Sequence, residues 1–175
     1  MSTGNPVKHL LQTLSHGVYV IGVADGEAVN AFTASAVMQV SLQPLMFALA
    51  INPWHASYPM LRAAGAFSVT VLRHGQSEVA RIFGTHSARC SDKLAEVAWH
   101  PAASGAPVLD AGLAYFDCRV VSGFPAGDHE LVVAEVTAGD FLQSGAPPLR
   151  YEELGDMDGG GSLLPERLGG KVPEG

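Results

Sequence analysis

The sequence has 175 residues, a length typical of one domain, because chains divide into separate cores only beyond roughly 250 to 300 residues. A hydrophobic fraction of 47% against 15% charged residues excludes disorder over most of the chain. The net charge of −7 offers no basic surface for a phosphodiester backbone, so we expect no nucleic-acid partner. The chain lacks a signal peptide and an apolar run of the roughly 18 residues that a membrane span needs, which predicts a cytoplasmic protein without membrane contact.

The first elements in chain order are a helix and a β-hairpin. Apolar residues at helical spacing predict a helix over residues 5–17, with Asn5 as its cap and Pro6 in its first turn. β-branched and apolar residues predict strands at 18–24 and 28–32, joined by a tight turn.

The rest of the chain alternates short apolar runs with turn residues. These runs predict four more strands, at residues 46–51, 67–72, 114–121 and 130–136. Short helices are predicted at residues 57–63 and 77–83, a polar loop at 84–93 and a turn at 123–128.

Several strands with short helices between them exclude a doubly wound parallel sheet, which needs strands alternating with long helices. The sequence therefore predicts a mainly β fold, a small antiparallel barrel with peripheral helices. We assign residues 1–154 to this domain. Residues 155–175 hold seven of the twenty glycines and little that can pack, so we expect a tail or an arm that a partner orders.

Familiar chemical motifs are missing from the sequence. It contains no GxGxxG, GxxxxGK[ST] or GxSxG, which excludes a dinucleotide-binding βαβ unit, a P-loop and a hydrolase nucleophile elbow. The cysteines, Cys90 and Cys118, lack CxxC spacing, and the histidines form no HxH or HExxH pattern. We therefore predict no metal site in the local sequence; only tertiary assembly could make one.

A run of hydroxyl and small side chains, residues 33–41, lies between two apolar strands. Small residues leave backbone N–H groups accessible and hydroxyls add donors, so an uncharged loop of this kind can hold a phosphate or the polar edge of a ring system. An ordinary loop is the alternative interpretation.

The string NAFTASAVMQVSLQPLMFALAIN, residues 30–52, resembles the flavin-binding segment of the flavin reductase-like family. The resemblance continues in the family's order through FSVTVL at 67–72, DKL at 92–94, GAPVL at 105–109, GDH at 127–129 and AEV at 134–136. It covers roughly residues 10–151 and implies an FMN-binding split β-barrel. It also implies a homodimer with the flavin near the subunit interface.

The resemblance assigns cofactor-binding roles to residues of three kinds. Donors to the flavin ribityl chain and phosphate would come from Thr33, Ala34 and Ser35. The isoalloxazine edge would be passed by Gln39, Val40 and Ser41. A loop over the phosphate side would be flanked by Asn52 and Ser57, although Pro53, Trp54 and His55 depart there from the family's basic or polar residues.

An FMN phosphate on a protein of net charge −7 also requires a local cation. Arg81 and Lys93 are the candidates that lie in the family-like stretches. His129 of the GDH sequence stands where reductase members face the nicotinamide, so the resemblance predicts it as the catalytic residue.

The function that the resemblance implies is an NAD(P)H-dependent flavin reductase, which transfers hydride from NADH or NADPH to FMN or FAD. It could serve as the reductase component of a two-component monooxygenase. The alternative is a non-catalytic FMN-binding electron carrier or redox-sensing module on the same fold, because fold alone does not fix activity. Trp54 or the C-terminal tail lying across the flavin ring would favour the carrier.

Overall fold

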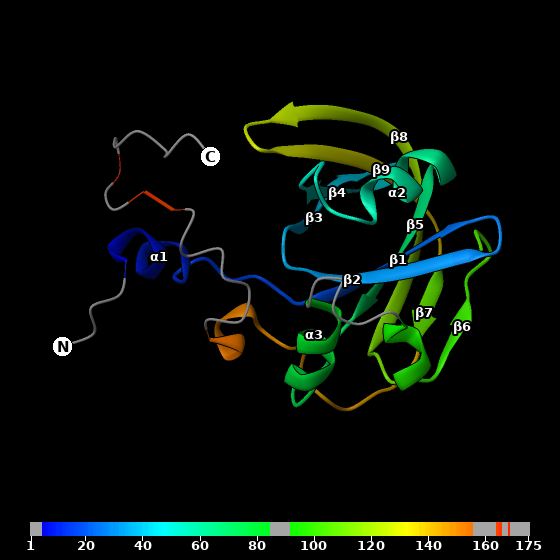
Figure 1. Ribbon diagram of the computed structural model, residues 1–175. Coiled ribbons are helices and arrows are strands. Elements are labelled where there is room, and N and C mark those ends of the chain that lie inside the picture. Colours follow the sequence, from blue (N-terminus) through cyan, green and yellow to red (C-terminus); the bar gives the residue numbers. More distant parts are fainter. Residues whose placement is uncertain (1–4, 85–91, 156–163, 166–167, 169–175) are drawn as a thin grey trace.

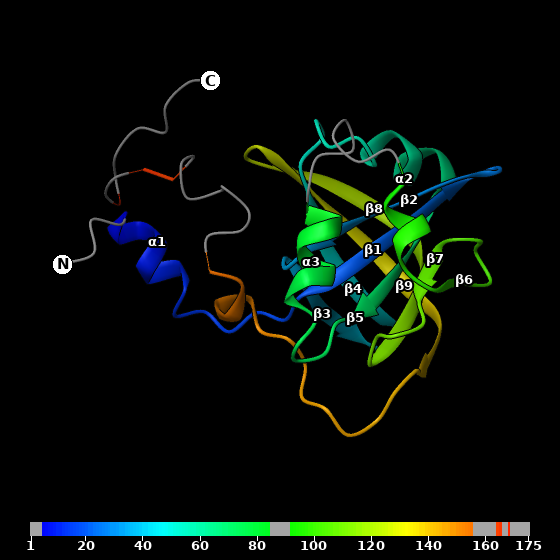
Figure 2. The ribbon, with the colours of Figure 1, turned by 60° about the horizontal axis from the view of Figure 1, so that its bottom comes forward.

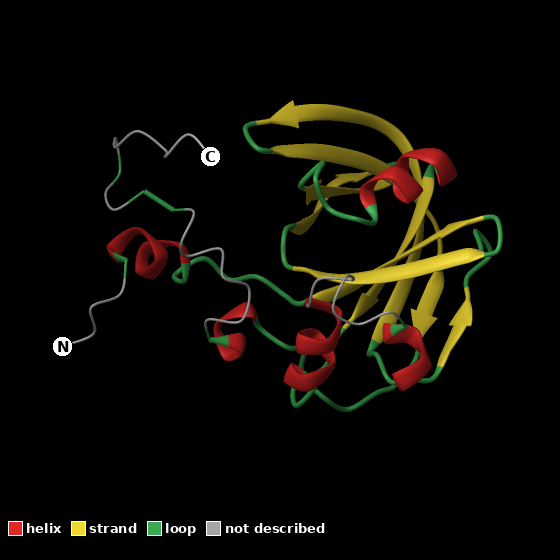
Figure 3. Cartoon of the chain, viewed as in Figure 1, coloured by secondary structure: helices red, strands yellow, loops and turns green. Residues whose placement is uncertain are grey.

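The computed structural model describes residues 5–84, 92–155, 164–165 and 168. A seven-stranded antiparallel sheet has the order β2–β1–β5–β8–β9–β4–β3, with a separate ribbon of β6 and β7 (Figure 1). The strands are β1 (Tyr19–Asp25), β2 (Ala28–Ala34), β3 (Val37–Leu42), β4 (Leu45–Ile51), β5 (Ala66–Val71), β6 (Trp99–Pro101), β7 (Pro107–Leu109), β8 (Ala114–Ala126) and β9 (His129–Phe141). The helices are α1 (Pro6–Leu11), α2 (Tyr58–Ala64), α3 (Ser77–Gly84), η2 (Lys93–Glu96) and η3 (Tyr151–Leu154). The predicted mainly β class with short helices is confirmed (Figure 3).

The sheet curls because its two edge strands follow one another in the chain. β2 ends at Ala34 and β3 begins at Val37, so only Ser35 and Ala36 join the edges. Six inter-strand steps would separate the edges of a flat sheet by roughly 29 Å. Three Cα steps span roughly 10 Å at most, so the strand ends must approach each other. Among the described residues no ladder joins β2 to β3, and closure into a barrel stays a prediction.

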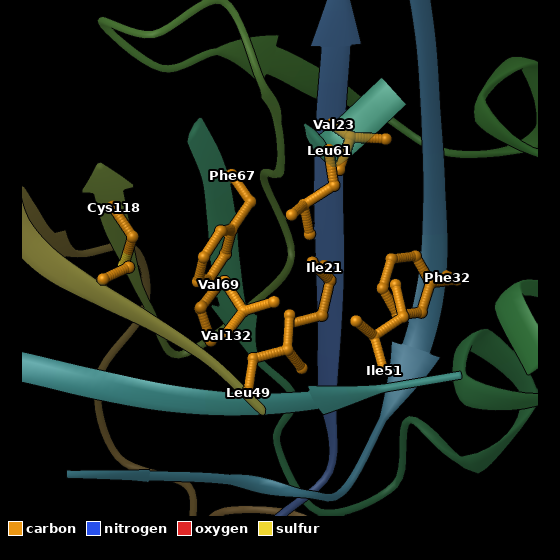
Figure 4. Close-up of a cluster of buried hydrophobic side chains, with 11 residues drawn as sticks. Ile21, Val23, Phe32, Leu49, Ile51, Leu61, Phe67, Val69, Cys118 and Val132 are labelled. Atoms are coloured by element: carbon orange, nitrogen blue, oxygen red, sulfur yellow. The ribbon is translucent and has the colours of Figure 1, made fainter. Parts of the chain in front are cut away.

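Strand β1 separates two hydrophobic cores. Ile21 and Val23 face the cluster inside the curled sheet, where Figure 4 shows Ile21 converging with side chains from several other strands. Val20 belongs to the second cluster, which α3 covers with Phe83. Both faces of β1 are therefore buried, which explains why its sequence is continuously apolar instead of alternating.

The β8–β9 hairpin is longer than predicted, and the expected turn at residues 123–128 is wrong. Pairing continues to Ala126 opposite His129, so the turn contains only Gly127 and Asp128. Gly127 has φ of 68°, at the position where two-residue turns favour glycine. Pro125 is tolerated because, in the described ladders, that end of β8 pairs with β9 alone.

Two further predictions differ from the structure. The first helix ends at Leu11 and not at residue 17; α1 stands apart from the sheet in both views (Figures 1 and 2), and a short helix whose leucines are exposed has little to stabilise it. The predicted loop over residues 33–41 contains the end of β2 and most of β3, because Val37 to Leu42 pair with β4.

Some predictions fall on residues that the structure leaves undescribed. Of the polar loop, residues 85–91 lie outside the described residues. The predicted tail also lies outside them, apart from residues 155, 164–165 and 168. The ribbon of β6 and β7 and the short helices η2 and η3 were not expected from the sequence.

Candidate functional site

A cavity of about 140 Å³ lies at the end of β2, beside the link between the sheet edges. Three consecutive residues that the sequence singled out, Thr33, Ala34 and Ser35, line it. The other lining residues are Val18, Gly84, Tyr151, Leu154 and Gly155. We call this space the β2 cavity.

The Thr33 and Ser35 hydroxyl groups of the β2 cavity differ in whether they already donate a hydrogen bond within the protein. The Thr33 hydroxyl donates to the carbonyl of Ala80 at 2.7 Å and so ties β2 to α3. Among the described residues the Ser35 hydroxyl has no hydrogen-bond partner. Ser35 is therefore a side-chain donor that an anion or a polyol in the cavity can use, whereas Thr33 would first have to release Ala80.

The far wall of the β2 cavity comes from the C-terminal segment, which sequence reasoning missed. Leu149 is buried; its amide donates to the carbonyl of Leu72, and its carbonyl accepts from the amide of Val18. The His74 ring lies 2.6 Å from the Glu153 carboxylate. The Arg150 amide, and then His74, hold the pKa of Glu153 below its ordinary value. The sequence of this wall, PPLRYEEL at residues 147–154, carries no motif that would have indicated its role.

The two candidate cations, Arg81 and Lys93, lie close to α3 but do not line the β2 cavity. Arg81 is in the last turn of α3 and its side chain is mostly exposed. Lys93 is buried, and its ammonium donates to the carbonyl of Phe83 at 3.3 Å. A cation there offsets the negative end of the helix, which accounts for the burial of a lysine.

Gln39, Val40 and Ser41 lie on β3, the edge strand. The pairing with β4 shifts register between Gln39 and Ser41, so Val40 bulges out of the ladder. The Gln39 amide nitrogen lies 3.4 Å from the Ser41 carbonyl oxygen. These three residues do not line the β2 cavity.

Asn52 and Ser57 shape the loop between β4 and α2. The Asn52 side-chain oxygen accepts from the amide of Trp54 at 2.9 Å, and its carbonyl accepts from the amide of His55. Ser57 is buried at the start of α2, where its hydroxyl accepts from the Asn30 amide nitrogen and makes no capping bond. Both residues hold the loop that presents Trp54, whose side chain is 94% exposed.

A second hollow, of about 410 Å³, lies between this loop, α2 and the tip of the β8–β9 hairpin. We call it the hairpin pocket. It is lined by Pro53, Trp54, Arg62, Gly123, Pro125, Gly127, Asp128, His129 and Glu130. The structure thus places His129 in a concave site, but one that shares no lining residue with the β2 cavity.

Glu130 connects the hairpin to α2. One carboxylate oxygen accepts from Arg62 at 3.0 Å and the other accepts from the Tyr58 hydroxyl. The hydrogen bond to Glu130 raises the pKa of Tyr58 above its ordinary value. Gly123 lies directly against this pair, and a Cβ there would collide with the Glu130 carboxylate. Sequence reasoning did not single out Glu130, because a lone glutamate in a strand carries no motif.

The described residues also bear on metals, membranes and thiol chemistry. Over that part of the chain no group of three or more His, Cys, Asp or Glu side chains could hold a metal ion, and no helix is long and apolar enough to cross a membrane.

Cys118 is buried in the core, and burial raises the pKa of its thiol to about 12. The thiolate, which is the reactive form, is therefore strongly disfavoured at neutral pH.

Comparisons with known proteins identify the family and the fold of the chain. Residues 11–157 match the family model described as flavin reductase like domain. The FMN reductase (NADH) RutF of Variovorax paradoxus is 35% identical over 75% of this chain and 72% of that protein. The solved structure of nitrilotriacetate monooxygenase component B from Mycobacterium thermoresistibile has a TM-score of 0.76 and 28% identity, covering 82% of this chain and 79% of that chain.

The chain also matches a longer protein, a diflavin flavoprotein of Nostoc sp., with 35% identity over 83% of this chain. The chain spans 25% of that protein's length. The family model covers most of the 175 residues, so the chain belongs to the flavin reductase-like family. The resemblance seen in the sequence is confirmed.

Proposed function

We propose that the protein is an NAD(P)H-dependent flavin reductase that binds FMN at the β2 cavity. The observation that carries this proposal is that Thr33, Ala34 and Ser35 line a cavity, in a chain of the flavin reductase-like family. When bound, FMN supplies the hydride acceptor. The chain then has to bind the flavin and the nicotinamide, orient them toward each other and exclude water. It needs no side-chain nucleophile for this reaction.

The donor set of the β2 cavity fits FMN. Small side chains let a ligand approach the backbone, and the Ser35 hydroxyl can donate to a phosphate oxygen. Lys93 and Arg81 carry positive charge at the neighbouring helix α3, but the Arg81 guanidinium lies 3.7 Å from the Glu78 carboxylate. Lys93 is therefore the cation proposed to lower the cost of bringing a phosphate to a protein of net charge −7. We propose FMN as the flavin, with FAD as the alternative.

His129 is proposed to face the nicotinamide from the hairpin pocket. Its ring is partly exposed and lies 2.8 Å from the Asp128 carboxylate, which orients it at the tip of the hairpin. A contact of this kind positions the dinucleotide, and positioning can contribute several kcal/mol to a bimolecular reaction, of the order of 7 to 11 at most.

We further propose that the protein is a homodimer. Edge strand β3 exposes Met38, Val40 and Leu42, and Leu42 is 82% exposed. An apolar edge strand is a surface that a second copy can cover. Since the β2 cavity and the hairpin pocket have separate linings within one chain, a flavin at the subunit interface could meet the first in one copy and the second in its partner. Size-exclusion chromatography with light scattering tests this, and a monomer that still holds FMN would contradict it.

The remaining proposals concern the partner protein, the cellular location and the domain boundaries. Similarity to a monooxygenase component supports a role as the reductase of a two-component monooxygenase, which would take the reduced flavin. Two cysteines without disulfide or zinc spacing suit a reducing compartment, which supports the cytoplasm. We keep residues 1–154 as the catalytic domain and residues 155–175 as a tail.

Anaerobic titration tests the proposed function directly. The purified protein should carry, or bind on addition, FMN with its absorption near ~450 nm, and NADH or NADPH should bleach that band. A bound flavin that neither nicotinamide reduces would refute the reductase and leave the electron carrier. Failure to bind any flavin would refute both.

A further inference from the structure

The far wall of the β2 cavity is a short element with little burial of its own. Tyr151, Leu154 and Gly155 line the cavity from this wall, and the first two belong to η3. None of the four residues of η3 is fully buried; Tyr151 and Leu154 pack partly against the second hydrophobic cluster. The turn, orange in Figures 1 and 2, lies outside the sheet. A single turn with so little burial has low local stability, so its bonds to neighbouring segments have a large share in fixing it.

Glu153 connects this turn to the loop that precedes α3. One of its carboxylate oxygens accepts from the amide of Arg150 at 2.9 Å and so caps η3. The other oxygen lies 2.6 Å from Nδ1 of His74, a residue 79 positions earlier in the chain. The Glu153 carboxylate thus joins the far wall to a distant part of the fold.

The loop that carries His74 is itself held by hydrogen bonds. Gln76 is buried; its side-chain oxygen accepts from the amide of Arg73 at 2.8 Å, and its side-chain nitrogen donates to the carbonyl of Ala111 at 3.0 Å. The amide of His74 donates to the carbonyl of Pro147 at 2.8 Å. Helix α3 follows this loop, and its last residue lines the β2 cavity. His74 is therefore a fixed point to which the far wall is attached.

We propose that His74 is a positioning residue for the flavin site: through Glu153 it holds η3 at the β2 cavity and slows the release of bound flavin. His74 does not line the cavity, so it acts without touching the cofactor. The two side chains are 65% and 28% exposed, and a partly exposed pair has a modest effect, which falls on flavin release and not on folding of the chain. This inference rests on the proposed function, because it requires the flavin to occupy the β2 cavity.

Release of FMN from the full chain is measured by stopped-flow fluorescence after dilution of the loaded protein. We expect His74→Ala to release FMN roughly two-fold to five-fold faster than the wild type, as fits a partly exposed pair. His74→Asn keeps a side-chain N–H near the position of Nδ1 and should restore most of the wild-type rate. The double variant His74→Ala, Glu153→Ala should release FMN no faster than Glu153→Ala, because a residue that acts through another adds nothing once that other is gone.

His100 supplies a matched control. Its Nδ1 also lies 2.6 Å from a carboxylate, that of Asp110, both side chains are partly exposed, and neither lines the β2 cavity. His100→Ala should leave FMN release unchanged. A wild-type rate of release in His74→Ala would overturn the inference. So would single effects that add in the double variant, or a His74→Asn protein that loses FMN as fast as His74→Ala.

A second measurement needs no flavin. The amide of Tyr151 donates to the carbonyl of His16 at 2.9 Å, and hydrogen exchange in the flavin-free protein reports how often this bond opens. Exchange there should be faster in His74→Ala and not in His100→Ala; an unchanged rate in His74→Ala would overturn the inference. If His74→Ala releases FMN faster but neither nicotinamide reduces the wild-type flavin, the reductase function fails and the inference stands. A wild type that binds no flavin would refute both.

Discussion

The hydroxyl of Tyr58, on α2, donates a hydrogen bond to the carboxylate of Glu130, the residue that follows His129 in β9. Arg62, one turn further along α2, donates to the other oxygen of the same carboxylate. Helix α2 and the hairpin are therefore fixed to each other at the strand position next to His129. The orientation of His129 thus depends on a helix that follows β4 in the chain.

Replacing Tyr58 with Phe should lower the thermal stability of the protein in a way that depends on pH. The hydrogen bond to Glu130 raises the pKa of Tyr58 above the ordinary value of 10.0. A group whose pKa is raised by folding stabilises the fold below its ordinary pKa, and that contribution is lost as pH rises through the raised pKa. The difference in Tm between wild type and Tyr58→Phe should therefore be full at pH 8 and shrink above pH 10.

Tyr115→Phe is the control for this experiment. Tyr115 is on β8, and its hydroxyl has no hydrogen-bond partner among the described residues. Its Tm difference should not show the same decline with pH. A Tyr58→Phe difference that is absent at pH 8, or that grows at high pH, would contradict the prediction.

Replacing Ser35 with Ala should weaken FMN binding while leaving riboflavin binding nearly unchanged. A hydrogen bond to a charged group contributes about 1.5 to 3 kcal/mol, which is roughly ten-fold or more in the dissociation constant of FMN. Fluorescence titration with both flavins measures this, with the exposed Ser144→Ala as control. Equal losses of affinity for FMN and riboflavin would show that Ser35 does not bind the phosphate.

Thr33→Ala should also weaken FMN binding, but through a second cause. The substitution removes the bond to the Ala80 carbonyl, so it disturbs the packing of α3 on β2 as well as the cavity. Thr33→Ser keeps the hydroxyl and should restore most of the loss. If Thr33→Ser binds FMN no better than Thr33→Ala, the hydroxyl is not what the site needs.

Replacing His129 with Ala separates the reductase from the carrier. A contact made only with the second substrate should leave FMN affinity unchanged and slow flavin reduction by roughly ten-fold to a hundred-fold. Stopped-flow absorbance gives the reduction rate, and a flavin titration gives the affinity. Loss of FMN binding would make His129 structural, and no change in either quantity would place it outside the site.

Cys118 should resist alkylation in the folded protein. Its thiol is buried, and burial raises its pKa to about 12, so the thiolate is scarce at pH 8. Iodoacetamide labelling followed by peptide mass spectrometry should modify this cysteine only after denaturation. Rapid labelling of the native protein would show that β8 opens to solvent far more often than the buried core implies.

The strands were largely predictable because their residues are buried on one or both faces. The apolar run that became β1 is one example, since both its faces meet a core. The length of the β8–β9 hairpin was not predictable, because glycine and proline near its tip look like a turn while the backbone continues to pair.

The cavity residues Thr33, Ala34 and Ser35 were found from their small and hydroxylated side chains together with the family resemblance. Tyr151 and Glu130 were not found, because each acquires its role through partners far away in the sequence. Tyr151 reaches the β2 cavity because the nearby Leu149 amide donates to the carbonyl of Leu72, more than seventy residues earlier. Only tertiary structure reveals such partners.

Ser35 and Ala36 are the two residues that join one edge strand of the sheet, β2, directly to the other, β3. The same short segment borders the cavity proposed for the flavin. Lengthening it by one or two residues would relax the curl of the whole sheet and move the cofactor's donors at the same time. One short segment thus contributes both to the curvature of the sheet and to the proposed cofactor site. A change in the length of this segment would therefore affect both.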